Sequence, residues 1–312
     1  GVGRVLGALG GTGGITDGTF VDFAQVSPEK LSLLPSSPSS AIGTSRKPLE
    51  ADDYRDLAHA LERAGVRWLL PTGGNGTMNT CGEIWRACQG VSIDVVGIPK
   101  TMDNDIAVTD HAPGYASAAL YMAASVSEVC CDVRGLPIHI VIVEAMGRNA
   151  GWVTAASALA DESGTGGPDL IYLPEREFDE HAFLDDCQRL IDEKGSGVVV
   201  VSEGLHKTGG GPVAPILMQT GRSTYFGDVS AHLSRLVISE LGYKSRSEKP
   251  GLLGRASMPW QSTIDRNEAI ECGREAVRAV LAGDSGKMVG IERLSTSPYE
   301  VRYTRIPIEQ VM

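Results

Sequence analysis

The sequence predicts an α/β fold made of two Rossmann-like lobes, with largely parallel sheets flanked by helices. Three stretches, 66–88, 93–134 and 138–160, repeat one order: an apolar strand, a polar or glycine-containing turn, then a helix. Successive units of this kind imply a parallel sheet. The composition agrees, since 38 glycines and only 5% aromatic residues favour a loop-rich α/β protein over an all-β sandwich or a coiled coil. We expect lobes at 1–136 and 137–312, with the chain crossing between them near its C-terminus.

The N-terminal part of the chain predicts mostly short elements. A glycine-dense stretch, Gly10–Gly14, lacks both the G-x-G-x-x-G spacing and a P-loop lysine, and no clear strand precedes it. We therefore expect a flexible loop there rather than a phosphate cradle. A short strand is expected at Phe20–Phe23, and Ser27 followed by Pro28 predicts the start of a short helix. Apolar residues at helical spacing predict a longer helix over Asp52–Ala64.

A cluster of polar side chains follows the strand predicted at Ile93–Ile98. A proline ends this strand, and directly after it come Lys100, Thr101, Asp103 and Asp105. Open α/β sheets bind ligands at the carboxyl ends of their strands, and a cation beside two carboxylates suits a phosphorylated substrate with a hydroxyl group. The alternative is an Asx-rich turn with a solvated lysine, which the same residues would also favour.

A glycine-rich turn lies between the strand predicted at 66–72 and a helix expected at 78–88. Backbone amides at such a helix start can approach phosphate oxygens, and the helix dipole adds to the attraction. A tight connection between strand and helix needs small residues in any case. The turn by itself is therefore consistent with either a phosphate-binding site or a purely structural connection. Its residues are Gly73, Gly74, Asn75, Gly76 and Thr77.

Polar side chains also end two apolar strands in the second half of the chain. The strand at 138–143 leads to Met146, Gly147 and Arg148, and the strand at 197–202 leads to Glu203. An arginine on a glycine-containing loop could hold phosphate in a bidentate way, and Glu203 could accept a sugar hydroxyl. A solvated arginine and a helix-capping glutamate are the alternatives. His139, in an apolar strand, is more typical of a hydrogen-bonded core or interface histidine than of a catalyst.

Further helices are expected at 179–194, 228–241 and 265–281, an irregular stretch at 251–263, and a last strand at 288–291.

Charge and cysteine content argue against several classes of protein. A net charge of −11 and a pI of about 5.1 argue against a surface for nucleic acids or anionic membranes, which would need a basic face. The six cysteines show no C-x-x-C pairs and no partnering histidine cluster, so we expect reduced, mostly buried thiols. No apolar run approaches the roughly 20 residues of a membrane span, and no secretory leader is present. We therefore expect a cytoplasmic protein.

Taken together, these motifs resemble those of the phosphofructokinase family. The turn at 73–77 is similar to the family's G-G-D-G-[ST] loop, Pro99–Asp105 to P-[GK]-T-[IM]-D-N-D, and Met146–Gly151 to M-G-R-x-A-G. The matches follow the family's order over most of the chain. The NAD and lipid kinases share the glycine loop but lack T-[IM]-D-N-D. Weaker similarities are Gly43–Arg46, Ser202–Gly204, and Leu253–Arg255 ahead of Asp265.

The resemblance implies phosphorylation of fructose 6-phosphate at its 1-hydroxyl, with Mg²⁺ as cofactor. It assigns Asp103 as the base on that hydroxyl, with Thr101 and Asp105 supporting the transferred phosphoryl group and the metal. It also implies a donor-binding lobe over 1–136, a sugar-phosphate-binding lobe over 137–312, and a homo-oligomer, either a dimer or a tetramer. The residues implied for the donor are Arg46, Gly74, Asn75, Gly76, Thr77 and Lys100; for the sugar phosphate Thr101, Asp103, His139, Met146, Gly147, Arg148, Glu203 and Arg255; for the metal Asn75 and Asp105. Lys100 and Arg148 are also implied in catalysis, and Arg46 would bridge the two substrates.

Two residues give opposite indications of the phosphoryl donor. Lysine at the position of Lys100 marks the pyrophosphate-dependent members of this family, whereas Gly76 is the residue that ATP-dependent members favour. We favour pyrophosphate and keep ATP as the alternative. Asn75 replaces the usual acidic residue, and Arg255 and Met258 stand where the family usually has His or Tyr and Arg. The family's first strand and its G-G-x-x-P-G-x-N loop would precede residue 1. Asn75 and the absence of that first loop support a further alternative, a regulatory homologue that binds phosphosugar without transferring phosphate, whereas the intact Thr101–Asp105 motif opposes it.

Overall fold

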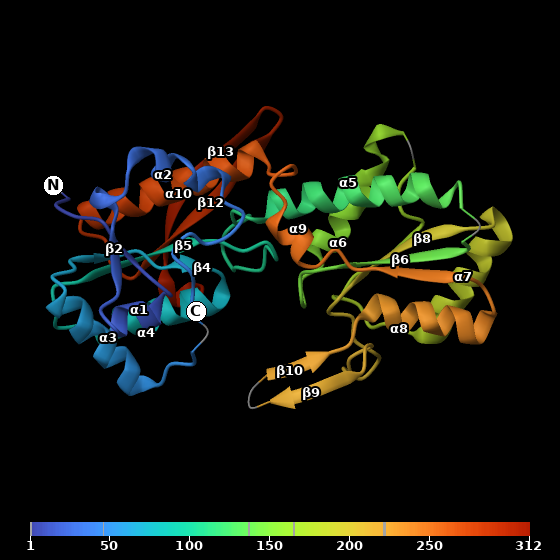
Figure 1. Ribbon diagram of the computed structural model, residues 1–312, viewed down its shortest axis with the longest axis horizontal. Helices are drawn as coiled ribbons and strands as arrows, with labels where there is room; N and C mark the ends of the chain where they lie inside the picture. Colours follow the sequence, from blue (N-terminus) through green and yellow to red (C-terminus); the bar gives the residue numbers. More distant parts are fainter. Residues whose placement is uncertain (1, 46, 137, 165, 221–222) are drawn as a thin grey trace. The chain divides into compact units, whose positions relative to one another are not determined.

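The computed structural model describes residues 2–45, 47–136, 138–164, 166–220 and 223–312. Within them the chain forms two compact units, each with its own sheet and helices (Figure 1). The predicted α/β fold with largely parallel, helix-flanked sheets is confirmed. Unit 1 comprises Gly1–Thr101, Asp105–Pro113 and Thr263–Met312, and unit 2 comprises Met102–Asn104 and Gly114–Ser262.

This division differs from the one expected at residues 136 and 137. Helix α5 (Tyr115–Val133) packs its buried residues on the strands of unit 2, so the boundary falls before the helix, between Pro113 and Gly114. The last segment, Thr263–Met312, belongs to unit 1. A helix joins the sheet that covers its apolar face, and spacing along the sequence does not say which sheet that is.

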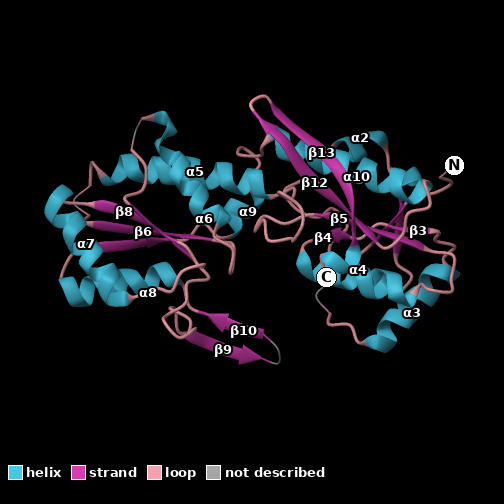
Figure 2. Ribbon diagram, turned by 180° about the vertical axis from the view of Figure 1, so that it is seen from behind, coloured by secondary structure: helices cyan, strands magenta, loops and turns pink. Residues whose placement is uncertain are grey.

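The sheet of unit 1 is built around β5 (Asp94–Pro99). Parallel to β5 run β3 (Trp68–Leu69), β4 (Thr72–Gly73) and β12 (Lys287–Thr296), and β13 (Tyr299–Pro307) pairs antiparallel with β12. Helices α3 (Ala51–Arg63) and α4 (Asn75–Ala87) cover one face, and α10 (Thr263–Leu281) covers the other (Figures 1 and 2). The apolar core of this unit therefore lies in two layers, above and below β5.

The N-terminal glycine stretch is not a plain loop. Strand β1 (Leu6–Ala8) precedes it and pairs antiparallel with β2 (Phe20–Asp22), and helix α1 (Thr12–Thr16) begins after Gly11. A strand of three residues is too short to show a period in the sequence, which is why no strand was expected there. The short helix expected after Ser27 is confirmed as α2 (Pro28–Ser32), whose Lys30 N donates to Ser27 Oγ.

The sheet of unit 2 is fully parallel, in the order β11, β6, β8, β7. Its central strands, β6 (Ile140–Ala145) and β8 (Gly197–Ser202), are buried along their whole length. Helices α5 and α6 cover one face, and α7 and α8 cover the other (Figures 1 and 2). The remaining bounds are β7 (Leu170–Tyr172), β11 (Ser245–Glu248), α6 (Trp152–Ala156), α7 (Glu180–Lys194), α8 (Val229–Leu236) and α9 (Leu252–Ala256), with short helical turns at 23–25, 34–36, 157–163, 237–241 and 308–310.

Helix α5 corrects one expectation drawn from the sequence. Its 19 residues reach a mean hydropathy of 1.2, so by length and composition alone this helix could span a bilayer. The helix is rich in small residues, and its buried positions pack together with residues of β6 and β8 in one apolar cluster. The apolar character therefore serves the core of unit 2.

A two-stranded antiparallel hairpin, β9 (Ile216–Thr220) and β10 (Ser223–Phe226), stands apart from the sheet of unit 2 (Figure 1). The sequence analysis did not expect it. Its apolar side chains are open to solvent, with exposed fractions of 53%, 70% and 54% for Ile216, Leu217 and Met218.

The cysteines are all free thiols, and five of the six are buried, as expected. Burial raises the pKa of Cys81 to about 12 and the pKa of Cys88 to about 11. Cys131, at the end of α5, is exposed.

Candidate active site

The glycine turn lies at the carboxyl end of β4, where the sequence analysis expected it. Gly73 pairs with Pro99 of β5, and Lys100 N donates to Gly73 O at 2.9 Å. Helix α4 begins directly after Gly74 without a side-chain cap. The first-turn amides therefore form the positive end of the helix dipole, an arrangement that attracts phosphate oxygens.

Close packing requires glycine at Gly73 of this turn, whereas a Cβ on Gly74 would make only ordinary contacts. A Cβ on Gly73 would lie 2.1 Å from Thr77 Oγ1, and a Cβ on Gly74 would lie 3.4 Å from Thr101 Cβ. A Cβ on Gly76 would meet no heavy atom within 4 Å. The turn thus packs against Thr101 while the space at Gly76 is open.

The turn and the polar cluster after β5 meet in unit 1. Asn75 Nδ2 donates to Asp105 O at 3.0 Å, and Thr101 Oγ1 donates to Asp105 Oδ1 over a long 3.4 Å. Thr101 is buried, whereas Lys100 and Asp105 are exposed. Asp103, half-buried, belongs to unit 2 together with Met102 and Asn104. The segment Lys100–Asp105 therefore contains residues of both units.

The two residues expected to hold a metal are adjacent, but they offer few ligands. The bond from Asn75 to the main chain of Asp105 uses the amide nitrogen, so Asn75 Oδ1 takes no part in it. Among the described residues, no group of three or more His, Cys, Asp or Glu side chains could hold a metal ion. Mg²⁺ is often bound by one or two carboxylates together with substrate phosphates, and the Asp105 carboxylate fits that pattern.

In unit 2, Glu203 holds the loop that follows β6. Its Oε1 accepts hydrogen bonds from Gly147 N at 3.2 Å and from Arg148 N at 3.1 Å. Ser202 Oγ donates to Arg148 O at 3.3 Å, and Glu203 N donates to Ala145 O at 2.9 Å. Glu203 was predicted to accept a sugar hydroxyl or to cap a helix, and here one of its oxygens orients the Met146–Arg148 loop.

This loop has an unusual backbone that the contacts explain. Gly147 has φ 142° and Arg148 has φ 52°, in the region that side chains other than glycine rarely adopt. A Cβ on Gly204 would lie 1.7 Å from Arg148 O, so only glycine fits there. The exposed side chain of Arg148 is thereby presented at the carboxyl end of the sheet.

Three further residues expected at the site are His139, Arg255 and Arg46. His139 is at the amino end of β6, where its Nδ1 accepts from Lys244 N at 3.3 Å and its ring lies edge-on to Tyr243. Because Met146 follows the other end of the same strand, this chain does not bring His139 to that loop. Arg255 is exposed on α9, and Arg46 falls outside the described residues.

A buried charge pair between Glu144 and Lys249 was not predicted from the sequence. Glu144, only 2% exposed at the end of β6, accepts from Ser230 N at 2.9 Å and from Lys249 Nζ at 2.9 Å. Burial alone would lower the pKa of Lys249, but its bonds to Asp228 and Glu144 outweigh that effect and raise this pKa. A lone glutamate within an apolar strand was the signal that could have revealed the pair.

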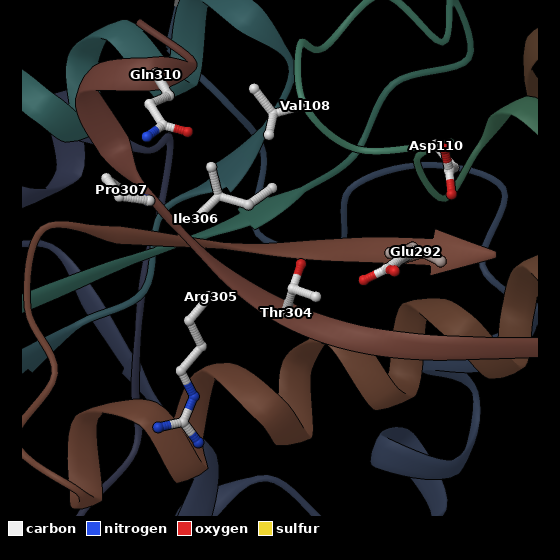
Figure 3. A pocket seen from close by; sticks show the side chains of 9 residues that line it. Val108, Asp110, Glu292, Thr304, Arg305, Ile306, Pro307 and Gln310 are labelled. Atoms are coloured by element: carbon white, nitrogen blue, oxygen red, sulfur yellow. The ribbon is translucent and has the colours of Figure 1, made fainter. Parts of the chain in front are cut away.

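A cavity of about 320 Å³ in unit 1 contains none of the residues predicted from the sequence. Its charges are largely satisfied within the protein: Glu292 pairs with Arg302 at 2.6 Å, and Arg305 pairs with Glu275 and Asp284. Figure 3 shows the Arg305 guanidinium pointing away from Ile306 and Gln310. The lining residues are Val108, Asp110, Ile291, Glu292, Thr304, Arg305, Ile306, Pro307 and Gln310.

Comparison with known proteins places these motifs in a family. A sequence profile described as Phosphofructokinase matches residues 2–280. The chain is 36% identical over 320 residues to pyrophosphate–fructose 6-phosphate 1-phosphotransferase of Xanthomonas campestris pv. campestris, covering 99% of this chain and 77% of that protein. It is 35% identical over 310 residues to sulfofructose kinase of Alkalicoccus urumqiensis, covering 97% of this chain and 80% of that protein.

A solved structure shows the same fold. The pyrophosphate-dependent phosphofructokinase of Nitrosospira multiformis matches with a TM-score of 0.88 at 29% identity, covering 99% of this chain and 76% of that one. With a glycine turn, a T-M-D-N-D segment and an M-G-R loop in the family's order, the chain belongs to the phosphofructokinase family.

Proposed function

We propose that this protein transfers a phosphoryl group from pyrophosphate to the 1-hydroxyl of fructose 6-phosphate, giving fructose 1,6-bisphosphate in glycolysis. The observation that carries the proposal is the junction in unit 1, where the glycine turn and the Lys100–Asp105 segment are joined through Asn75 and Thr101. The relative from Xanthomonas campestris carries the name of this reaction.

In unit 1 the donor phosphates lie at the start of α4. Amides of Gly74, Asn75 and Gly76 face the phosphate oxygens, whereas the Thr77 amide donates to Gly74 O, so Thr77 contributes its hydroxyl. The exposed ammonium of Lys100 neutralises charge that develops on the transferred group. Arg46 contributes a further positive charge between the two substrates. Phosphoryl transfer depends mainly on positioning and charge stabilisation, which are the contributions that these groups offer on the donor side.

Asp103 acts as the general base. Its carboxylate takes the proton of the sugar's 1-hydroxyl as that oxygen bonds to phosphorus and inorganic phosphate departs from pyrophosphate. Thr101 and Asp105 support the phosphoryl group from the same segment. Mg²⁺, carried by the donor phosphates and by Asp105 with Asn75, would neutralise phosphate charge.

The sugar phosphate is held in unit 2. Met146, Gly147 and Arg148 form its binding loop, Glu203 orients that loop and binds the sugar, and Arg255 contributes positive charge from α9. His139 lies at the opposite end of β6 from this loop, so it has no part in this proposed set of groups.

A competing donor, ATP, is favoured by one observation. A Cβ on Gly76 has no heavy atom within 4 Å, so a bulkier donor meets no side chain there.

The deciding experiment measures fructose 1,6-bisphosphate formation from fructose 6-phosphate with pyrophosphate or with ATP, with and without Mg²⁺. Faster turnover with ATP would replace the proposed donor, and no product from either donor would favour a non-catalytic phosphosugar-binding homologue. Sulfofructose as acceptor tests the activity named for the Alkalicoccus urumqiensis relative.

The protein acts as a cytoplasmic homo-oligomer, a dimer or tetramer, without nucleic-acid or membrane partners. The exposed hairpin β9–β10 supports the oligomer, because an isolated two-stranded hairpin is at best marginally stable in water and this one exposes Leu217. Substituting Leu217→Glu should shift the sedimentation coefficient toward the monomer, while Ser36→Glu, on an exposed turn of unit 1, should not.

A further inference from the structure

A cluster of three polar side chains in unit 1 has no part in the roles assigned above. His111 Nε2 lies 2.6 Å from Glu268 Oε2, and the Tyr299 hydroxyl donates to Glu268 Oε1 and lies 3.3 Å from His111 Nε2. The side chains of His111 and Glu268 are only 14% and 5% exposed. Each oxygen of the buried carboxylate therefore has a partner, which a buried charge requires.

These side chains come from parts of the chain that are far apart in sequence. His111 lies in residues 105–113, which we call the return segment; Glu268 lies on α10, and Tyr299 begins β13. Burial and the hydrogen bond to Glu268 raise the pKa of Tyr299, so its hydroxyl keeps its proton and remains a donor. His111 Nε2 must also carry a hydrogen to bond the carboxylate. The cluster thus fastens the return segment to two elements of the unit.

Backbone contacts fasten the same segment to β12. Ile291 N donates to Thr109 Oγ1 at 2.9 Å, and Asp110 N donates to Ile291 O at 2.9 Å. Arg293 N donates to Asp110 Oδ2 at 2.6 Å. Residues 109–111 are therefore bound on three sides, by β12, α10 and β13.

The residue before these anchors is strained. Val108 has φ 68°, a backbone conformation that a β-branched side chain adopts only when its surroundings impose it. Before Val108 in the chain, Ile106 is buried; after it, the hydrogen bonds of Thr109, Asp110 and His111 hold the backbone in place. Without those bonds, the segment would relax at Val108.

Both ends of the return segment meet Thr101. Thr101 N donates to Pro113 O at 3.0 Å, and Thr101 Oγ1 donates to Asp105 Oδ1 at 3.4 Å. A shift in the middle of the segment would therefore move the residues placed against the donor phosphate.

We propose that His111, bound to Glu268 and Tyr299, is a positioning residue that keeps Thr101 and Asp105 in register for phosphoryl transfer. This proposal rests on the proposed function, because it assigns His111 an effect on the chemical step. In this proposal His111 acts through Thr101 and Asp105, without itself contacting a substrate. Its loss should lower kcat and leave the KM for fructose 6-phosphate unchanged, since the sugar loop lies in unit 2.

The test compares His111→Phe, which keeps the ring shape but not the hydrogen bond, with His111→Gln, whose amide can still donate to Glu268. We expect kcat to fall roughly 10- to 100-fold in H111F, as for a small misplacement of reacting groups, and by less than about threefold in H111Q. Tyr299→Phe should lower kcat by an intermediate factor. Because this change is milder, it also serves as the test if H111F folds poorly. The matched control is His59→Phe, an exposed histidine on α3 of the same unit.

A second measurement separates this proposal from the proposed function. Amide hydrogen exchange over residues 105–113 should be faster in H111F than in the wild-type chain and in H59F. Unchanged exchange, or a kcat equal to wild type despite faster exchange, would overturn the positioning role. Should the wild-type chain turn over neither donor, the proposed function would fall, and the exchange rates alone would decide whether His111 holds the segment.

Discussion

Asn75 Nδ2 donates a hydrogen bond to the main-chain carbonyl of Asp105 at 3.0 Å, joining residues that are 30 apart in sequence. The G-G-D-G-[ST] motif that this turn resembles has an aspartate at the position of Asn75, and an ionised aspartate could not donate this bond. The contact gives Asn75 a positioning task in this chain.

Replacing Asn75→Asp should therefore lower activity. The substitution removes the donor and brings a second carboxylate next to Asp105, so we expect kcat to fall about tenfold at low Mg²⁺, with a partial return as Mg²⁺ neutralises the pair. The measurement is the initial rate over a Mg²⁺ titration. A variant equal to the wild type at every Mg²⁺ concentration would show that the hydrogen bond is dispensable.

Removal of the carboxylate in Asp103→Ala should lower kcat by roughly 10² to 10⁴, the usual effect of a positioned general base. Binding of fructose 6-phosphate should change little, because the Met146–Arg148 loop is held by Glu203. Steady-state kinetics check both values, with Asp56→Ala on the exposed face of α3 as control. An unchanged kcat would remove Asp103 from the mechanism.

Donor choice should depend on Lys100 and Gly76. We expect Lys100→Gly to lose pyrophosphate turnover selectively, because the small donor relies more on a single nearby cation than ATP does. Gly76→Asp should be tolerated sterically, since its Cβ meets no heavy atom within 4 Å, and should disfavour ATP. The ratio of kcat/KM for the two donors is the measurement. Equal losses with both donors in Lys100→Gly would refute the assignment.

Glu203→Ala should weaken sugar binding. Two amides, Gly147 N and Arg148 N, lose their shared acceptor, and the strained loop relaxes. Since hydrogen bonds to a charged group contribute about 1.5–3 kcal/mol each, we expect the KM for fructose 6-phosphate to rise at least tenfold. The KM for pyrophosphate should stay the same. A conservative Glu203→Gln variant keeps an acceptor oxygen, so its KM for fructose 6-phosphate should lie between those of the wild type and Glu203→Ala. Equal KM values in all three proteins would contradict this role.

Thiol modification should select Cys131. The thiolate is the reactive form, and burial raises the pKa of Cys81, Cys187 and Cys272 to about 12. We expect one thiol per chain to react rapidly with a disulfide reagent in the native protein, and none rapidly in Cys131→Ser. Rapid modification of a second thiol would indicate local opening of a core.

The sequence was sufficient where local chemistry decides the structure. Gly73 and Gly74 predicted a tight turn at a helix start, and the proline after Ile98 predicted the end of a strand. The polar residues could therefore be placed at the correct strand ends. Met146, Gly147 and Arg148 were found in the same way.

What the sequence could not show depends on contacts between distant residues. Whether α5 covers one sheet or another is settled by packing, and the hydrogen bond from Asn75 Nδ2 to Asp105 O joins two residues that are distant in the sequence. The cluster of His111, Glu268 and Tyr299 joins three separate stretches of chain, none of which has a motif of its own.

The division of the chain also limits how this protein can be recombined with its relatives. The chain passes between the two units at four junctions: Thr101/Met102, Asn104/Asp105, Pro113/Gly114 and Ser262/Thr263. No single crossover can exchange one unit for that of a relative, and two of the necessary junctions fall inside the segment that carries Asp103. An exchange of one whole unit therefore needs several crossovers, two of which flank Met102–Asn104.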